Sequence, residues 1–430
     1  MRPLDNQIDT KLTMKVFLVF QIFILSVFNH LPAYACTAFM MSDRQSVLVG
    51  NNEDYNIPYT RVWFIPAENG QYGRVYFGYD NWSPQGGMND QGLFFDFFAT
   101  KPLEVKLSKK KPKFQGPIID TMVAECATVK EVLDMLDQYN LEFMSKFQMF
   151  VVDKSGDAAI IEGDGIIRKS RSYQVVTNFY QSKVKENRRP CEWYKPSCTQ
   201  YKIAETMLTE HSTASVAHFR DILEATHRNT LGARTLYSNI YDLKKGLVYL
   251  YYMHNFDGEV IIDLNEELKK GCHYYELPSL FGKELKYSRK TYTHTDPVFT
   301  LSYPKHFKVT KPVKDEVLRI KCPLSSTPLF SVVVKEKPQD IRLQDIGTRH
   351  FTDELKKLGT KVRLVSTTQT VLSDGTPANE VFFDMVVNDH WPLKTMIVST
   401  YRGDKLIFAA VTSFAHPEAL REFLYSLRFD

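Results

Sequence analysis

One cysteine stands where proteolytic cleavage would make it the first residue of a mature chain. Cys36 directly follows Ala33-Tyr34-Ala35, and the run Val16–Phe28 before it is almost wholly apolar, with Lys15 ahead of it. This is the layout of a secretory signal peptide with a small-x-small cleavage site. Cleavage before Cys36 would place a thiol and a free α-amine on one residue. A nucleophile and a weak base would then be adjacent, as acyl transfer by an N-terminal nucleophile requires.

The segment before Cys36 is interpreted as a signal peptide over residues 1–35, with Met14 the better start. Its apolar run is shorter than the roughly 20 residues of a membrane span, so we expect an exported, periplasmic or extracellular protein without stable membrane insertion. The alternative is a lipoprotein acylated on Cys36. Bacterial lipoproteins usually carry Leu three places before the cysteine, where this chain has Ala33, and a small residue two places before, where it has Tyr34.

Length and composition predict a globular protein of two or three domains. The chain has 430 residues, is 43% hydrophobic and carries a net charge of only +4, which gives no reason to expect a nucleic-acid partner. We predict a catalytic domain over 36–290, a linker over 291–297 and an accessory α+β domain over 298–430. The histidines show no metal-ligand spacing and no glycine loop is suited to phosphate, so no metal or cofactor is predicted.

Strands and helices occur in segregated runs, which favours an α+β fold with sheets covered by helix layers. Cys36–Leu48 has strand character, and Gly50 with the polar residues after it predicts a turn. Thr128-x-x-Glu131 is a capping box that should begin a helix. Gly92–Phe98 predicts a buried strand containing Asp96, which we expect in polar surroundings.

The six cysteines suit an exported chain. Cys191 and Cys198 lie seven positions apart in a polar segment and predict a local disulfide. Cys126 lies on an apolar helical face and predicts a buried thiol. For Cys272 and Cys322 the sequence does not decide between pairing and free thiols.

Several motifs share the spacing of one enzyme family. They are Cys36-Thr37 at the predicted mature start, Gly50-Asn51-Asn52-Glu53-Asp54-Tyr55, Gly87-Met88-Asn89-Asp90-Gln91-Gly92-Leu93, Val176-Thr177-Asn178 and Thr235-Leu236-Tyr237-Ser238. Together they resemble the choloylglycine hydrolase and penicillin V acylase group of linear-amide hydrolases, related to acyl-CoA:6-aminopenicillanic acid acyltransferase. The resemblance covers Cys36 to about Pro278 and implies an αββα sandwich of the N-terminal nucleophile type.

The resemblance also implies roles for single residues. Cys36 would attack the amide carbonyl, and Asp54 would orient its α-amine. Asn178 would donate to the tetrahedral oxyanion, with a backbone N–H near Asn89 as a second candidate donor. Arg234 would lie beside the sulfur and favour the thiolate.

The chain departs from the bile-salt hydrolase pattern at two places near the expected substrate pocket. Asn51 stands where those enzymes usually carry Arg, and the Phe-Phe-Asp-Phe-Phe run at 94–98 offers no clear equivalent of a substrate-binding Asn or Tyr. A specific acyl group is therefore not predicted, and the run is a core strand or an acyl-pocket wall.

The sequence thus predicts an exported cysteine amidase that cleaves a small-molecule acyl amide through a Cys36 thioester. Two alternatives stay open: an acyltransferase that resolves the same thioester with another amine, and a lipoprotein or binding module with acylated Cys36. The C-terminal domain faintly resembles the PsbP-like fold through Phe299-x-Leu301-x-Tyr303-Pro304. A homo-oligomer is left open.

Overall fold

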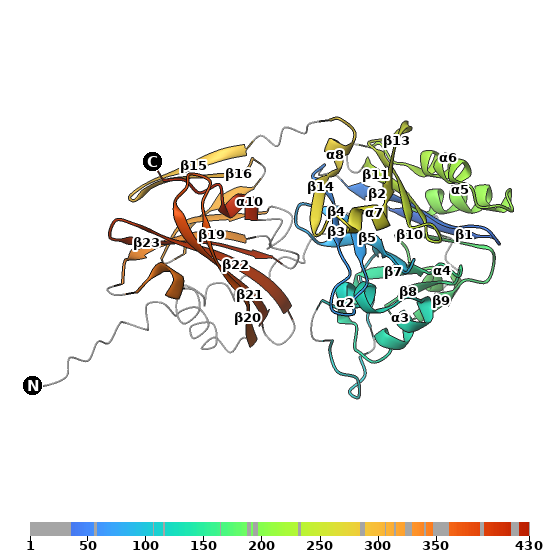
Figure 1. Cartoon of the computed structure of the whole chain (residues 1–430). Helices are drawn as coiled ribbons and strands as arrows, with labels where there is room; N and C mark the ends of the chain where they lie inside the picture. The colour runs from blue at the N-terminus through green and yellow to red at the C-terminus, as the bar shows by residue number, and fades with distance from the viewer. Residues whose placement is uncertain are drawn as a thin grey trace, which may run out of the picture.

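The computed structural model describes residues 36–429 apart from 56–57, 106, 115–116, 164, 187–190, 192–196, 231–233, 284–288, 306, 314, 323–328, 339–340, 347–360, 388–390 and 414–420. Figure 1 shows two lobes: the first holds the elements up to β14, and the second holds β15 to β23 with α10. The predicted signal peptide lies outside the described residues.

The first lobe is built on two antiparallel sheets. One has the strand order β10-β1-β2-β11-β12-β13 and the other β14-β3-β4-β5-β6-β7-β8-β9. The strands of the first sheet are β1 (Thr37–Ser42), β2 (Val47–Tyr55), β10 (Tyr173–Thr177), β11 (Arg234–Asp242), β12 (Leu247–Tyr252) and β13 (Asn255–Asp263). Those of the second are β3 (Thr60–Ile65), β4 (Arg74–Tyr79), β5 (Pro84–Asn89), β6 (Phe94–Ala99), β7 (Phe147–Val152), β8 (Ala158–Glu162), β9 (Gly165–Arg168) and β14 (His273–Glu276).

Helices cover the outer faces of both sheets. The predicted capping box begins α3, where Thr128 Oγ1 accepts from the Glu131 N–H and Glu131 accepts from the Thr128 N–H. Helices α5 and α6 lie on the first sheet, and α2 and α3 on the second (Figure 1). The helices of this lobe are α2 (Ile118–Glu125), α3 (Val129–Leu136), α4 (Gln181–Glu186), α5 (Ser197–Thr209), α6 (Val216–Thr226), α7 (Leu264–Leu268) and α8 (Leu277–Leu280), with a 3₁₀ turn at Glu142–Ser145.

Side-chain alternation divides the apolar residues among three cores. Along β1, Ala38 and Met40 face the second sheet, whereas Phe39 and Met41 face α5 and α6. The third core lies between the second sheet and α2 and α3, and the same cluster of buried residues includes Phe299, Leu301 and other residues of the second lobe. This layering is the predicted αββα sandwich. Among the described residues no helix is long and apolar enough to cross a membrane.

Strand β2 differs from the prediction. The polar residues after Gly50 do not form a turn; they continue the strand to Tyr55, and the turn lies at 43–46 instead. Gly50 pairs with Phe39 on β1, and a Cβ at this glycine would lie 2.6 Å from Phe39 Cζ. The glycine therefore makes room for an aromatic ring rather than for a bend.

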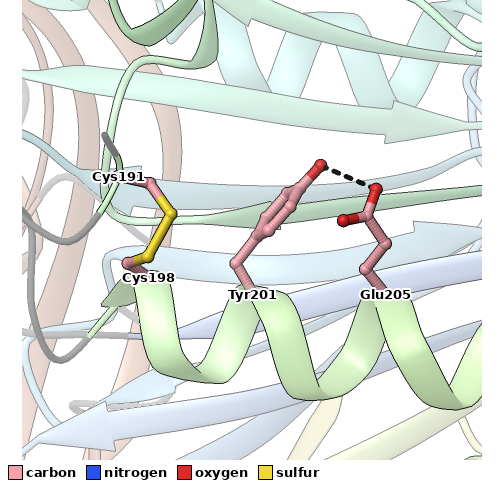
Figure 2. Close-up of a disulfide and its surroundings, with 4 residues drawn as sticks. All are labelled: Cys191, Cys198, Tyr201 and Glu205. Carbon is pink, nitrogen blue, oxygen red and sulfur yellow. Dashed lines mark hydrogen bonds between the residues drawn. A yellow bond between two sulfur atoms is a disulfide. The ribbon is translucent and has the colours of Figure 1, made fainter. Parts of the chain in front are cut away.

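Cys191 and Cys198 form the predicted disulfide, with a Cα–Cα distance of 5.3 Å. Figure 2 shows it at the first turn of α5, ahead of Tyr201 and Glu205, whose side chains are 3.4 Å apart at their oxygens. Cys126 is buried, as predicted, with its sulfur 3.9 Å from Met135 Sδ. The disulfide fixes the start of the helix that packs on β10 and β1.

The second lobe is an α+β domain around one antiparallel sheet of order β17-β18-β19-β23-β22-β21-β20. A separate hairpin, β15 with β16, pairs Arg289 to Thr295 with Val298 to Pro304. The remaining elements are β15 (Arg289–Thr295), β16 (Val298–Pro304), β17 (Lys308–Thr310), β18 (Glu316–Lys321), β19 (Leu329–Glu336), β20 (Lys361–Val371), β21 (Pro377–Val387), β22 (Trp391–Arg402), β23 (Lys405–Ser413), α10 (Arg421–Leu424) and a 3₁₀ turn at Leu343–Asp345.

This hairpin corrects the predicted linker at 291–297. Most of that segment is strand β15, and the rest is the turn to β16. Tyr292 holds the strand in place because its ring packs near Phe299 and its hydroxyl donates to the Val317 carbonyl at 3.1 Å. The second lobe therefore includes the hairpin from Arg289 onward. The predicted end of the first domain at residue 290 and the predicted start of the second at residue 298 both lie inside this hairpin.

Candidate active site

Cys36 lies immediately before β1, a strand flanked by β10 and β2. Its side chain is only 5% exposed and belongs to the core between the two sheets. The sulfur accepts a hydrogen bond from the Asp54 backbone N–H at 3.4 Å and lies 3.8 Å from the Asp54 carbonyl oxygen. The thiol is therefore fixed by the end of β2, as a positioned nucleophile requires.

Strand β2 carries polar side chains on both of its faces. Asn51 and Glu53 have the alternation of Val49, which faces the second sheet, and Asn52 and Asp54 have that of Leu48, which faces the helices. Asn52 confirms this direction because its Nδ2 donates to the Leu223 carbonyl on α6 at 2.9 Å. Two adjacent acids of one motif thus lie on opposite sides of a sheet.

Asp54 is held by hydrogen bonds from two elements. Its carboxylate accepts from Thr235 Oγ1 on β11 at 2.5 Å and from Gln200 Nε2 on α5 at 3.4 Å. Burial raises the pKa of Asp54 to about 7, although Thr235, the charge of Arg228 and Gln200 lower it. Gln200 lies two residues after Cys198, so the disulfide in Figure 2 anchors the helix turn that contacts this carboxylate.

Glu53 points to the opposite side, between the sheets. Its Oε1 accepts from the Tyr79 hydroxyl of β4 at 2.6 Å. Burial raises the pKa of Glu53 above its usual range, and the charge of Asp54 adds to that rise. Asp96 faces the same space from β6, between the inward-facing Phe94 and Phe98, and burial together with the charge of Glu53 raises its pKa as well.

These acids also act on the nucleophile. Burial raises the pKa of the Cys36 thiol well above its ordinary value, and the charges of Glu53 and Asp54 raise it further. A cation beside the sulfur would oppose both effects. Cleavage before Cys36 would create such a cation, because the α-amine released has a pKa of about 7.7–8.0 in peptides.

Asn178 follows β10 directly, and the pairing of Thr37 with Thr177 places it opposite Cys36 when the register continues by one residue. Its Nδ2 donates to the Ala99 carbonyl at the end of β6, at 2.8 Å. The structure thus brings Asn178 next to the nucleophile, with its amide donor engaged by the other sheet. Its role as an oxyanion donor stays a prediction.

Asn89 lies on the other side of the second sheet from Cys36. Its Nδ2 donates to the carbonyls of Val123 and Cys126, at 2.7 and 2.8 Å, and its Oδ1 accepts from the N–H groups of Gln91 and Leu93. All of its hydrogen-bonding capacity joins the β5–β6 turn to α2. The structure therefore gives Asn89 a structural role and does not bring it to the sulfur.

Arg234 is exposed at the first position of β11, where it pairs with Tyr55. The arginine whose charge acts on Asp54 is Arg228, which precedes the strand and whose N–H donates to Thr235 Oγ1 at 2.8 Å. Sequence reasoning chose the arginine at the strand start because no local pattern marks Arg228. The same holds for Gln200 and Tyr79, which only tertiary packing connects to the motif.

A metal centre has no support in the described part of the chain, where no three His, Cys, Asp or Glu side chains are arranged to hold an ion. The acids near Cys36 come from separate faces or separate sheets.

Comparison with known proteins assigns the chain to a class of enzymes. The fold is that of an N-terminal nucleophile sandwich with a cysteine before its first strand, and the class is that of enzymes acting on carbon–nitrogen bonds of linear amides. The family model described as acyl-coenzyme A:6-aminopenicillanic acid acyl-transferase matches residues 40–256. The chain belongs to this family.

Solved structures similar to the chain include penicillin V acylase from Agrobacterium tumefaciens, at 17% identity and a TM-score of 0.45 over 56% of this chain and 92% of that one. A variant of conjugated bile acid hydrolase from Clostridium perfringens has 14% identity and a TM-score of 0.45 over 56% and 97%. The solution structure of cyanobacterial PsbP from Synechocystis has 16% identity and a TM-score of 0.28 over 33% and 92%. No curated protein matches the chain significantly.

Proposed function

We propose that the chain is an exported cysteine amidase that cleaves the amide bond of an acylated small-molecule amine through a thioester on Cys36. The observation that carries this proposal is the position of the Cys36 sulfur. It is buried at the start of β1 and held by the Asp54 N–H at 3.4 Å. Membership in the acyl-transferase family supports the reaction class.

The first step is activation of the thiol. After cleavage before Cys36, the α-amine accepts the thiol proton, and the resulting ammonium offsets the neighbouring carboxylates that keep the thiol neutral in the uncleaved chain. Asp54 is the acid whose backbone N–H contacts the Cys36 sulfur, and its carboxylate is fixed by Thr235 and Gln200. A carboxylate with fixed orientation holds the ammonium in place.

Acylation and deacylation then follow with balanced bonds. The thiolate sulfur forms a bond to the carbonyl carbon, the carbon–nitrogen bond breaks, and the ammonium returns its proton to the leaving amine. A water molecule deprotonated by the α-amine attacks the thioester, the carbon–sulfur bond breaks, and the carboxylic acid leaves. Asn178 is the proposed oxyanion donor, and to act it must turn its Nδ2 away from Ala99.

The test uses protein with a verified mature N-terminus. Cys36→Ala, produced with the same cleavage before residue 36, should lose turnover on every linear amide that the wild type hydrolyses. Cys36→Ser serves as the conservative comparison. A Cys36→Ala protein with wild-type turnover refutes the proposal. Intact mass and N-terminal sequencing separate a free Cys36 from a lipidated one.

Burial of the sulfur disfavours the lipoprotein alternative, because the long lipid chains of a diacylglyceryl group on Cys36 Sγ are far bulkier than the acyl group of a small amide. The acyltransferase alternative is favoured by the description of the matching family. An acceptor amine added in millimolar amounts discriminates it from hydrolysis. Formation of a new amide in place of the free acid would assign the chain to acyl transfer.

A further inference from the structure

Polar side chains from both sheets meet in the core between the sheets beside Cys36. Asn51 and Glu53 enter it from β2, Tyr237 from β11 and Asp96 from β6. Each of these four side chains belongs to a residue no more than 3% exposed. In a sandwich core, polar groups this deeply buried normally have hydrogen-bond partners.

Here many of them lack a partner among the described residues, and nearly all of the unpartnered atoms are acceptors. The acceptor atoms are Asn51 Oδ1, Glu53 Oε2, Asp96 Oδ2, Gln148 Oε1, Asn178 Oδ1 and Asn239 Oδ1. The Tyr237 hydroxyl joins them as an unpartnered buried group of the same space. An orphaned buried acceptor costs free energy unless a ligand or water supplies a donor.

Two of these acceptors are carboxylates that act on the nucleophile. The charges of Glu53 and Asp96 both affect the Cys36 thiol, and those of both affect the Tyr237 hydroxyl. The groups acting most strongly on Glu53 are Tyr79, Asp54, Cys36 and Asn51. Those acting on Asp96 are Glu53 and the Phe97 N–H, and neither set contains a Lys, Arg or His. No cationic side chain of the described chain therefore acts strongly on this pair, and the α-ammonium that cleavage would release is assigned above to Asp54, on the other face of β2.

We propose that Glu53 and Asp96 bind a primary ammonium group on the acyl portion of the substrate, a few atoms from the carbonyl that Cys36 attacks. This inference rests on the proposed function and names its substrate class as aminoacyl amides. An ammonium offers three donors and one positive charge, which match two carboxylate oxygens and a neighbouring amide or hydroxyl oxygen. The rings of Phe94, Phe98 and Tyr237 add faces that suit a cation.

The enclosure favours the acyl portion over the leaving amine. The acyl group stays covalently bound through the thioester, whereas the amine must depart after the first step. Glu53 and Asp96 are 3% and 0% exposed, so a group bound to them is enclosed by the protein. A bulky acyl group would meet Tyr79, Phe94 and Phe98, which face the same space, and a short chain is therefore expected.

The test uses isosteric 4-nitroanilides on the mature enzyme. Glycyl is compared with propionyl, β-alanyl with butyryl, and 4-aminobutyryl with pentanoyl, so that each pair exchanges an ammonium for a methyl group. For the best pair we expect kcat/KM to favour the ammonium by about tenfold or more, as charge-assisted hydrogen bonds allow. Glu53→Gln and Asp96→Asn should each bring the ratio of kcat/KM within that pair close to one. Because both acids also act on the Cys36 thiol, the readout is this ratio and not the absolute rate.

A matched control is Asp242→Asn at the other end of β11. Asp242 is also buried, but it pairs with Leu48, six positions along β2 from Asp54, or about 20 Å away. This variant should keep the preference. Unfolding midpoints of all variants show whether each is folded. If Glu53→Gln does not fold, the substrate preference of Asp96→Asn tests the ammonium subsite.

Failure of this inference is distinguishable from failure of the proposed function. Turnover with equal or greater rates for the neutral acyl groups overturns the ammonium subsite and leaves the amidase intact. A preference that appears only when the ammonium is on the leaving amine also overturns the ammonium subsite. Propionyl amides of 4-(aminomethyl)aniline and 4-ethylaniline test this. Calorimetry on Cys36→Ala measures binding without turnover: equal affinity for β-alanyl and butyryl anilides overturns the subsite. Selective binding without any wild-type turnover supports it while refuting the amidase.

Discussion

Asp54→Asn should reverse its effect on stability as the pH rises. The unfolded Asp54 has its ordinary pKa of 3.8, and burial raises the folded value to about 7. The folded state thus holds a proton that the unfolded state has released between these values, and stability falls as the pH increases through them. At about 1.36 kcal/mol for each pH unit, the 3.2 units from 3.8 to 7 amount to about 4 kcal/mol.

The asparagine variant lacks this loss but has a cost of its own. Its Nδ2 meets Gln200 Nε2, which cannot turn freely because it also donates to the Thr226 carbonyl at 2.8 Å. One unsatisfied buried donor costs about 1–3 kcal/mol. We therefore expect Asp54→Asn to be less stable than wild type below about pH 5 and more stable above about pH 7. Urea unfolding followed by circular dichroism at pH 4.5, 6, 7.5 and 9 measures the free energy of unfolding of the wild type and of the variant.

The experiment is made on chains that retain Ala35 before Cys36 and repeated on the mature form. In the mature form the α-ammonium of Cys36 stabilises the Asp54 carboxylate, so the pH-dependent difference between wild type and variant should shrink. A constant difference at all pH values would refute the buried, protonated Asp54. Identical profiles in the two forms would refute its pairing with the α-amine.

Three further outcomes follow from the site. Arg228→Ala should lower kcat/KM about tenfold and raise the apparent pKa of Asp54 in a pH profile, because the charge of Arg228 lowers that pKa. The control Arg234→Ala, at the exposed start of β11, should keep kcat/KM within about threefold of the wild-type value. Asn89→Ala should lower the unfolding free energy by about 2–4 kcal/mol through its lost buried hydrogen bonds and leave KM unchanged in the folded fraction; a large KM change would contradict its structural role. The double variant Cys191→Ser with Cys198→Ser should lower the free energy of unfolding by about 2–3 kcal/mol, because the unfolded chain is no longer constrained by a short closed loop. The measurement is the shift of the unfolding midpoint. Added reductant should produce the same shift in the wild type and none in the double variant.

The parts of the fold that the sequence predicted are those with local causes. The Thr128–Glu131 capping box and the disulfide between Cys191 and Cys198 each depend on residues a few positions apart. The family motifs placed Cys36 and Asp54 together, and the strand register confirms their contact.

The errors arise where partners are distant in sequence. A run of Asn-Asn-Glu-Asp is typical of a turn, yet here it is a buried strand in which Asn52, Asp54 and Glu53 hydrogen-bond to Thr226, Thr235 and Tyr79, respectively. The sequence did not show whether Arg228 or Arg234 acts on the site, because only the folded structure shows which of the two charges affects Asp54. The β15 hairpin escaped prediction because its polar sequence has one anchoring residue, Tyr292.

The alternation along β2 has a consequence for how such an enzyme diversifies. Odd positions, Asn51 and Glu53, face the space where a substrate would lie, and even positions, Asn52 and Asp54, hold the strand to the helix layer. Substitution at the odd positions can therefore change which molecule is accepted while the supports of the nucleophile persist. An insertion or deletion of one residue would instead exchange the two sets. Evolution of new substrates on this strand should accordingly proceed by replacement, with its length held constant.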